Sequence, residues 1–429
     1  MKSTIAKPAS GTRYRMLFMV FFSVVINYMD RSNISIAAFA ISEDLALSSV
    51  QMGLIFSAFA WTYAGLQIPG GMLVDKVRPR ILYTFMMALW SIATLIQGFA
   101  SSLLTFIGIR ASMGVFEAPS YPANNRIVTS WFPEKERASA IAVYTSGQYI
   151  GLAFLTPTLV AIQDALGWRG LFIVSGIVGL LWAVVWYMFY RDPARHQTVS
   201  QSELDYISEG GGLIGMGTRE SDRKKINWAD FGQAFRYRKL WGIYIGQFCI
   251  GSLVIFFLTW FPTYLVKYRG MDFLESGFLA SIPFLAAFVG VLLSGFLSDF
   301  LLKRGFSAEV ARKAPVLFGM LLSVSIIGAN YAESNWLIIA CLAVAFFGNG
   351  LASITWVFVS SIAPQRLIGL IGGVFNLMGG LSAVVIPLVI GVLVEGGDFR
   401  PALFFIGMLA LLGFFSYVFL VGKVQRITS

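Results

Sequence analysis

Twelve long apolar runs dominate the pattern of hydrophobic and polar positions along the chain. A helix needs roughly 20 apolar residues to cross a lipid bilayer, and each run is about that length or longer. The runs cover residues 14–41, 49–74, 80–100, 102–126, 138–165, 169–190, 239–266, 274–302, 312–331, 335–362, 367–396 and 399–422. The pattern therefore predicts an all-α membrane protein with twelve transmembrane helices.

The longest polar stretch lies between the sixth run and the seventh. It divides the chain into a predicted N-terminal six-helix bundle (1–190), a cytoplasmic central loop (191–238) and a C-terminal six-helix bundle (239–429). Composition agrees with a membrane protein, because 57% of the 429 residues are hydrophobic and only 13% are charged. A soluble protein has about 25% charged residues to cover its surface.

The distribution of Lys and Arg indicates how the chain is oriented. Cytoplasmic loops of membrane proteins are enriched in these residues. With twelve spans, all but six of the 32 Lys and Arg lie on the side that holds both termini and the central loop. The six exceptions are Arg31 and Arg110 within spans and Arg169, Lys267, Arg269 and Arg400 on the opposite side. We therefore expect both termini to be cytoplasmic, in the inner membrane of a bacterium, and we attribute the net charge of +10 to these loops rather than to a nucleic-acid partner.

A short motif occurs at equivalent places in the two halves. The second span ends in Gly-Met-Leu-Val-Asp75 and the eighth in Gly-Phe-Leu-Ser-Asp299, and basic residues follow both. An acid at a helix end beside basic residues suits a latch between helices, although a simple positive cytoplasmic loop is the alternative. The repetition favours two pseudo-symmetric six-helix bundles around a central site.

Cysteine and histidine are too few to supply other chemistry. Cys249 and Cys341 lie in apolar runs, and the only histidine, His196, lies in the central loop. This content argues against a disulfide framework, a histidine-rich metal site and a membrane enzyme, and we expect no metal or organic cofactor. A receptor usually carries a soluble output domain, for which the loops are too short. We expect a monomer.

Four charged residues lie within the first-half spans away from the span ends, where burial is costly and often functional. Asp30 and Arg31 are adjacent in the first span, and Arg110 and Glu117 are two helical turns apart in the fourth. Adjacent residues point in different directions, so we expect Asp30 to address a neighbouring Arg and Arg31 to face the cavity. The alternative is that all four only form structural ion pairs.

These residue types point to coupled transport of an anion. The Arg31 fork can bond both oxygens of a substrate carboxylate. Buried carboxyl groups favour the neutral form and can carry protons, which makes Glu117 and then Asp30 the candidate proton carriers, with Arg110 as a charge partner. A drug/proton antiporter is the alternative within this fold, but it would favour acids without an intramembrane Arg.

Neutral polar residues form a second candidate set. Helix–helix hydrogen bonding is an equal alternative for each one alone. Together, amides, hydroxyls and aromatic rings suit a hydroxylated carboxylic acid. The candidate substrate-binding positions are Tyr28, Tyr63, Gln148, Ser353, Trp356 and Asn376, besides Arg31.

Several segments resemble a known family. These are Tyr28-Met-Asp-Arg31, Gly114-Val-Phe-Glu-Ala-Pro119, Asn124-Asn-Arg126 with Thr129-Ser-Trp-Phe-Pro-Glu134, and Thr145-Ser-Gly-Gln148. They are similar to the anion:cation symporter family of the major facilitator superfamily, over essentially the whole chain. One departure is Arg78, where the family's loop signature usually has Gly.

The resemblance implies a proton-coupled symporter that imports a sugar acid by alternating access. It implies that Arg31 anchors the carboxylate and that Asp30 and Glu117 are protonated, with Arg110 as partner. The neutral positions named above match the cavity lining of the family. The runs 151–157, 352–356 and 373–376 favour D-galactonate as the substrate, with glucarate and hexuronates as alternatives.

Overall fold

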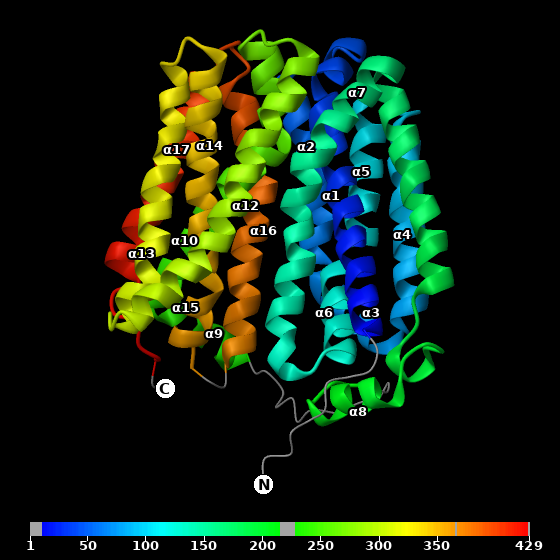
Figure 1. Ribbon diagram of the computed structural model, residues 1–429. Helices are drawn as coiled ribbons and strands as arrows, with labels where there is room; N and C mark the ends of the chain where they lie inside the picture. The colour runs from blue at the N-terminus through cyan, green and yellow to red at the C-terminus, as the bar shows by residue number, and fades with distance from the viewer. Residues whose placement is uncertain (1–10, 215–227, 365–366, 428–429) are drawn as a thin grey trace. The chain divides into compact units, whose positions relative to one another are not determined.

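The computed structural model describes residues 11–214, 228–364 and 367–427, and within these ranges it is helical and contains no strand (Figure 1). The helices of the first half are α1 (Thr12–Asp44), α2 (Ser49–Gly65), α3 (Gln67–Lys76), α4 (Pro79–Gln97), α5 (Leu103–Glu117), α6 (Ser120–Trp131) and α7 (Glu134–Phe189). Two short helices follow, α8 (Gln201–Glu209) and α9 (Trp228–Arg236). The second half contains α10 (Arg238–Thr259), α11 (Phe261–Thr263), α12 (Phe273–Lys303), α13 (Ala308–Ser323), α14 (Asn335–Leu351), α15 (Trp356–Ile362), α16 (Ile368–Leu393) and α17 (Arg400–Phe415).

The helix lengths account for twelve spans. Eight helical segments of the described chain are long and apolar enough to cross a membrane. One of them lies in α7, whose 56 residues would extend about 84 Å, far more than a bilayer core of about 30 Å. Gly167, with φ 70° and ψ 174°, breaks α7 into two spans. The remaining spans are α1 and two interrupted helices, α2–α3 and α5–α6.

Side-chain caps fix where several helices begin. Ser102, Ser200, Asp272, Ser307 and Ser334 each precede a helix and accept a hydrogen bond from a backbone N–H of its first turn. Such a cap satisfies one of the four N–H groups that have no partner inside the helix. The sequence thus specifies these helix starts locally, independently of the apolar runs that follow them.

The internal contacts of the chain define two compact units. Unit 1 comprises Met1–Asn33, Trp61–Leu152 and Leu166–Asp222. Its core is rich in large aromatic residues, and the stacked series Tyr83–Trp186–Tyr190 has ring centroids 4.4 and 4.5 Å apart. Aromatic pairs of this kind add to the apolar burial. This core holds α4 against the second span of α7 and supports the helices that carry the buried charges.

Unit 2 comprises Ile34–Ala60, Ala153–Ala165 and Arg223–Ser429. Phe257 and Phe346 stack with centroids 4.0 Å apart at its core. Close helix contact depends on small residues, since a Cβ on Gly348 of α14 would lie 2.9 Å from the Ser323 nitrogen of α13. Small residues allow membrane helices to approach in this way.

Unit 2 includes short segments from the first half of the sequence. In α2, Phe56 packs edge-on against Trp260, and Gly53 lies against the backbone of Pro387 in α16. The Trp260 indole N–H donates to the Pro387 carbonyl at 3.1 Å. These contacts cross the boundaries expected from the sequence, 1–190, 191–238 and 239–429, so that division stays a prediction.

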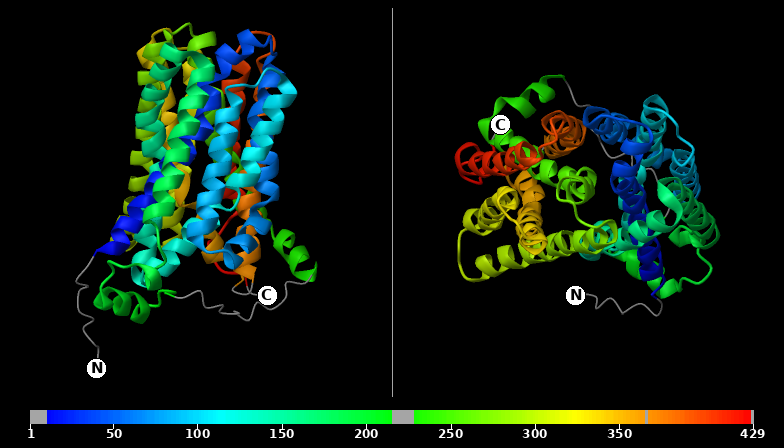
Figure 2. Two further views of the ribbon diagram at one scale, coloured as in Figure 1. Left: turned by 90° about the vertical axis from the view of Figure 1, so that its right-hand side faces the viewer. Right: turned by 90° about the horizontal axis from the view of Figure 1, so that it is seen from above.

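An ionic cluster joins the central loop to the helices of unit 1. Arg13 of α1 lies 3.1 Å from Glu203 of α8 and 3.3 Å from Glu136 of α7. Tyr206 of α8 donates to the same Glu136 carboxylate. In Figures 1 and 2, α8 lies beyond the lower ends of the unit 1 helices. The cluster therefore anchors the first part of the loop to the ends of two spans.

Candidate functional site

An ion pair between α1 and α5 lies at the centre of the candidate site in unit 1. The Arg31 Nε donates to Glu117 Oε2 at 2.8 Å. The Glu117 side chain is fully buried, and that of Arg31 is 14% exposed. Glu117 is the last residue of α5, because the helix is interrupted before α6 near Pro119. The interruption places the carboxylate at a helix end facing α1.

Two tyrosines flank the guanidinium of Arg31. Its Cζ lies 5.2 Å from the ring centroid of Tyr28 and 4.7 Å from that of Tyr63. Tyr28 is one turn before Arg31 on α1, and Tyr63 comes from α2. Cations are attracted to aromatic faces at these distances, more strongly where water is excluded. The rings therefore fix the orientation of the Arg31 side chain.

A hydroxyl chain extends the site from Arg31 toward α7. The Tyr121 hydroxyl oxygen lies 3.4 Å from both the Tyr28 hydroxyl and the Gln148 Oε1, so its single proton can be donated to either one. Gln148 is half-buried. The structure thus brings Tyr28, Tyr63 and Gln148 together with Arg31, as the sequence predicts for one substrate site.

Asp30 lies in a different environment from its neighbour. Its side chain is completely buried, and neither carboxyl oxygen has a hydrogen-bond partner among the described residues. A Cβ on Gly179 of α7 would lie 3.8 Å from its Oδ2. The Trp90 indole of α4 is a neighbouring donor, outside hydrogen-bond geometry.

The expected ion pair between Asp30 and an Arg is absent from the described structure. Successive residues of a helix are about 100° apart around its axis, so Asp30 faces α4 and α7 while Arg31 faces α5. Arg110 is buried in α5, two turns from Glu117 and on the same face. The acid that pairs with an Arg here is Glu117, and its partner is Arg31.

The candidate residues of the second half lie in unit 2 at a helix interruption. Between α14 and α15, residues Ala352–Thr355 form a 3₁₀ turn that contains Ser353 and leads into Trp356. Trp356 is 51% exposed and packs edge-on against Phe375, the residue before Asn376 of α16. Interrupted helices with exposed polar groups are typical of transporter sites.

Two polar residues, one in each unit, contact candidate positions or their neighbours and are not among the sequence predictions. Tyr121 links Tyr28 to Gln148, and Gln247 of α10 accepts from the Thr355 hydroxyl at 3.2 Å. Pro119 lies two residues before Tyr121, and a proline inside an apolar run is the sequence signal that could have identified this position. Gln247 is a lone amide in an apolar run, and a polar residue at that depth is the signal that could have found it.

The side chains of the latch residues Asp75 and Asp299 lie outside the described residues. Within the described residues, no three His, Cys, Asp or Glu side chains are grouped as metal ligands. Cys249 and Cys341 are free thiols.

Twelve helical spans, interrupted helices and a buried charged cluster define a multi-pass membrane transporter. The family model described as Major Facilitator Superfamily matches residues 20–387. The chain therefore belongs to the major facilitator superfamily, and it is a transporter and not an enzyme. The all-helical major facilitator fold with twelve spans, expected from the sequence, is confirmed.

Curated relatives narrow the family. The chain is 50% identical to a D-galactonate transporter of Escherichia coli O6:H1, over 98% of each chain. It is 41% identical to a probable galactarate/D-glucarate transporter of Bacillus subtilis, over 99% of this chain and 95% of the relative. The family resemblance predicted from the sequence motifs is thereby confirmed.

Solved structures support the fold. A bacterial homologue of the human lysosomal transporter Spinster, in an inward-facing and occupied conformation, matches with a TM-score of 0.77 at 20% identity. The match covers 96% of this chain and 97% of that chain. At this identity, the likeness shows the fold alone.

Proposed function

We propose that this transporter is a proton-coupled symporter that imports a sugar acid by alternating access, with D-galactonate as the first candidate substrate. The observation that carries the proposal is the buried Arg31–Glu117 ion pair. It combines, in one place, a group that recognises carboxylates and an acid that can change its charge. The 50% identity to a D-galactonate transporter supports the choice of substrate.

The substrate carboxylate binds the guanidinium of Arg31. Arg31 already holds one carboxylate, that of Glu117, at 2.8 Å, so its position and orientation are suited to a second of the same chemistry. Tyr28 and Tyr63 flank the guanidinium and hold its plane. Their hydroxyls, with that of Tyr121 and the amide of Gln148, supply donors and acceptors for the hydroxyl groups of a sugar acid.

Proton coupling follows from charge balance. A second carboxylate near Arg31 and an ionised Glu117 would place two negative charges in a water-poor site, which is unfavourable. Protonation of Glu117 removes that repulsion, so substrate and proton favour each other's binding. Asp30 provides a second protonation site, because an ionised carboxylate without a hydrogen-bond partner would be costly at its buried position. The protons are co-transported, and the proposal requires no bound cofactor.

Arg110 provides positive charge on the same face of α5 as Glu117. When Glu117 leaves Arg31, the buried guanidinium of Arg110 limits the cost of carrying an ionised acid through the empty-carrier step. This role uses the two-turn spacing of Arg110 and Glu117, which places the groups about 10 Å apart along the axis. The charged residues of unit 1 then act together as the coupling device.

The second-half residues recognise the hydroxylated part of the substrate. Ser353 and Asn376 supply a hydroxyl and an amide, and Trp356 supplies an exposed aromatic face. The spans of this half lack ionisable residues away from their ends. This neutral chemistry favours a monocarboxylate such as D-galactonate over the dicarboxylates glucarate and galactarate, whose second acid would need its own cation. A hexuronate remains the alternative monocarboxylate.

We also propose the orientation given by the positive-inside rule. The protein lies in the bacterial inner membrane as a monomer, with both termini, α8 and α9 on the cytoplasmic side. Lys and Arg concentrate on that side of the chain.

Asp75 and Asp299 are proposed as conformational latches at the cytoplasmic ends of the second and eighth spans. Asp75→Asn should shift the population toward the inward-facing state and leave intrinsic substrate affinity nearly unchanged. Labelling of single cysteines on the cytoplasmic side should increase in this variant. Unchanged labelling would contradict the latch.

Reconstitution into proteoliposomes tests the whole proposal. Uptake of labelled D-galactonate should depend on an inward proton gradient and should stop when a protonophore collapses it. An excess of unlabelled D-galactonate should compete fully, a hexuronate less and glucarate least. Galactonate uptake that persists at full extent without a proton gradient would contradict coupling. Stronger competition by glucarate would contradict the monocarboxylate assignment.

A further inference from the structure

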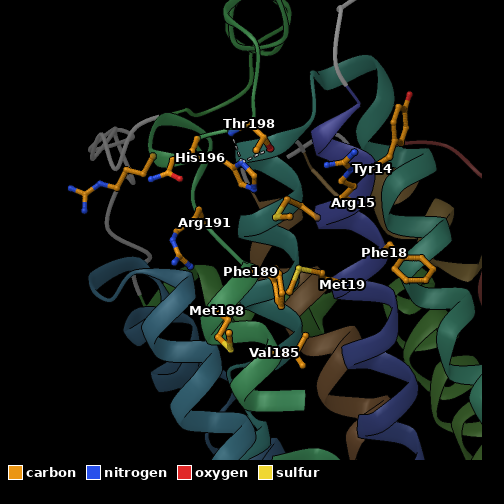
Figure 3. A pocket seen from close by; sticks show the side chains of 13 residues that line it. Tyr14, Arg15, Phe18, Met19, Val185, Met188, Phe189, Arg191, His196 and Thr198 are labelled. Carbon is orange, nitrogen blue, oxygen red and sulfur yellow. Dashed lines mark hydrogen bonds between the residues drawn. The ribbon is translucent and has the colours of Figure 1, made fainter. Parts of the chain in front are cut away.

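A groove opens in unit 1 where α1 meets the end of α7. Its volume is about 700 Å³, and residues 191–198 of the central loop cover its upper end in Figure 3. It lies at the ends of two spans, far along α1 from Arg31, so it is distinct from the substrate site. Its lining divides into a basic end beside the loop and an apolar floor along the helices.

The basic end of the groove contains three guanidinium groups and the only imidazole of the chain. Arg15 comes from α1, and Arg191, Arg195 and His196 come from the segment after α7. Among the described residues, neither Arg15 nor Arg191 forms an ion pair. Arg191 uses Nη1 to bond the carbonyls of Tyr187 and Tyr190, at 3.0 and 2.7 Å, which fixes it at the end of α7. Its other N–H groups can bond an anion.

The electrostatics of His196 report the positive field in the groove. Burial lowers the pKa of His196, and the positive charges of Arg191 and Arg15 lower it further. Glu203 acts in the opposite direction, but Arg13 and two backbone N–H groups already bind its carboxylate. The His196 Nδ1 lies 3.3 Å from the Thr198 nitrogen, an arrangement in which the neutral ring accepts there and carries its proton on Nε2. The basic end is thus preformed for a negative charge.

The floor of the groove is apolar and exposed. Phe18 is 59% exposed, Met188 57% and Phe189 59%, and Val185 and Met19 lie between them in Figure 3. Phe18 is about one helical turn further along α1 than Arg15, so the floor begins about 5 Å below the basic end. Exposed apolar side chains on a membrane span face lipid acyl chains.

We infer that this groove binds an anionic phospholipid, with the phosphate on Arg15 and Arg191 and an acyl chain along Phe18 and Met188. Basic pockets between transmembrane helices at the membrane surface are suited to anionic headgroups. A soluble phosphate compound would use the basic end and leave the apolar floor in water, whereas a lipid occupies both. Under the proposed orientation, the lipid belongs to the cytoplasmic leaflet.

Native mass spectrometry of the purified transporter tests the lipid site. Phosphatidylglycerol, titrated against phosphatidylcholine of the same chain length, should give a tightly retained first adduct on the wild type. Arg15→Gln/Arg191→Gln should weaken that adduct by about tenfold, since two charge-assisted bonds are lost. The control Arg238→Gln removes an exposed guanidinium that bonds the Phe419 carbonyl at the start of α10, outside the groove, and should bind as the wild type does. Equal phosphatidylglycerol binding in the double variant would overturn the assignment.

Two further measurements distinguish a lipid site from a soluble-anion site and locate the bound lipid. Inorganic phosphate and glycerol 3-phosphate should fail to displace phosphatidylglycerol at millimolar concentration, and full displacement would indicate a soluble-anion site instead. A photoactivatable phosphatidylglycerol should label the wild type on peptides containing Phe18 or Met188, which requires no variant to fold. Labelling confined to other spans would overturn the proposal.

Discussion

The two parts of the chain that contribute candidate site residues differ in the kind of polarity they bury. In unit 1, α1 and α5 contain Asp30, Arg31, Arg110 and Glu117, all buried or nearly so. In unit 2, the interrupted α14–α15 segment and α16 contribute hydroxyls, amides and a Trp, with Thr355 bonded to Gln247. The charge of a carboxyl group changes when it binds a proton, whereas the hydroxyls, amides and Trp of unit 2 stay neutral. Under the proposed function, the charged residues of unit 1 couple transport to protons and the neutral residues of unit 2 select the substrate.

Removal of the Arg31 guanidinium should have the largest effect on substrate binding and exchange. Arg31→Ala should reduce galactonate binding and exchange by about 100-fold, because a charged hydrogen-bond donor is lost from a buried site. Arg31→Lys keeps the charge but loses the fork, and should cost about tenfold. Exchange in proteoliposomes measures both, with Arg238→Gln as the matched control. Normal binding by Arg31→Ala would contradict the anchor role.

Neutralisation of the acids should separate exchange from accumulation. Glu117→Gln resembles the protonated form and can still accept a bond from Arg31, so it should bind and exchange substrate but fail to accumulate it against a gradient. Asp30→Asn should also lose driven uptake, and should fold, because Asp30 has no hydrogen-bond partner among the described residues to lose.

Paired assays of exchange and of uptake driven by a pH gradient distinguish these outcomes. Full accumulation by Glu117→Gln would leave a structural ion pair as the better account of Arg31 and Glu117.

Substitutions of the neutral residues in unit 2 should have smaller effects. They should change the KM for substrate rather than the dependence of uptake on protons. Ser353→Ala and Asn376→Ala each remove one neutral hydrogen bond and should raise KM by about three- to tenfold. The dependence of uptake on the proton gradient should stay as in the wild type. Uptake measured at two imposed gradients checks this, with Ser325→Ala as a control hydroxyl in unit 2 that bonds the Cys341 carbonyl. An altered proton dependence would break the division between the two parts.

The smallest expected effect concerns His196, outside both sets. Because burial and two Arg charges lower its pKa in the folded state, the unfolded chain binds a proton more readily. Its contribution to stability is therefore complete above about pH 6.5 and is lost as the pH falls through the folded-state pKa. His196→Asn should reduce the drop in Tm between pH 7 and pH 5.5. A larger drop in the variant would contradict the sign of the shift.

The sequence alone predicts the spans, because hydropathy depends only on the order of residues along the chain. The break of α7 at Gly167 falls between the expected runs 138–165 and 169–190, because polar Asp164 and Arg169 flank the turn there. The discontinuities at Pro119 and at residues 352–355 lie inside runs that hydropathy treats as continuous. Length and apolar content cannot reveal an interruption that keeps the segment in the membrane.

The sequence singles out candidate charged residues but does not give their pairing. Depth and residue type identify Asp30, Arg31, Arg110 and Glu117, because charge is rare within spans. Which acid meets which base depends on rotation of α1 against α4, α5 and α7, and the sequence does not give that angle. The expected Asp30–Arg pair therefore differs from the observed Arg31–Glu117 pair.

The Arg31–Glu117 ion pair also means that a substrate carboxylate must compete with Glu117 for the Arg31 guanidinium. Glu117 is a carboxylate on the same chain as Arg31. It therefore competes with the substrate intramolecularly, at an effective concentration higher than that of a dilute external ligand. Under the proposed coupling, a soluble acid binds Arg31 only when Glu117 is protonated, so the apparent affinity for substrate rises with proton concentration although no contact to the substrate changes. The same coupling predicts weak binding of carboxylates at high pH and little entry of acids when the proton gradient is weak.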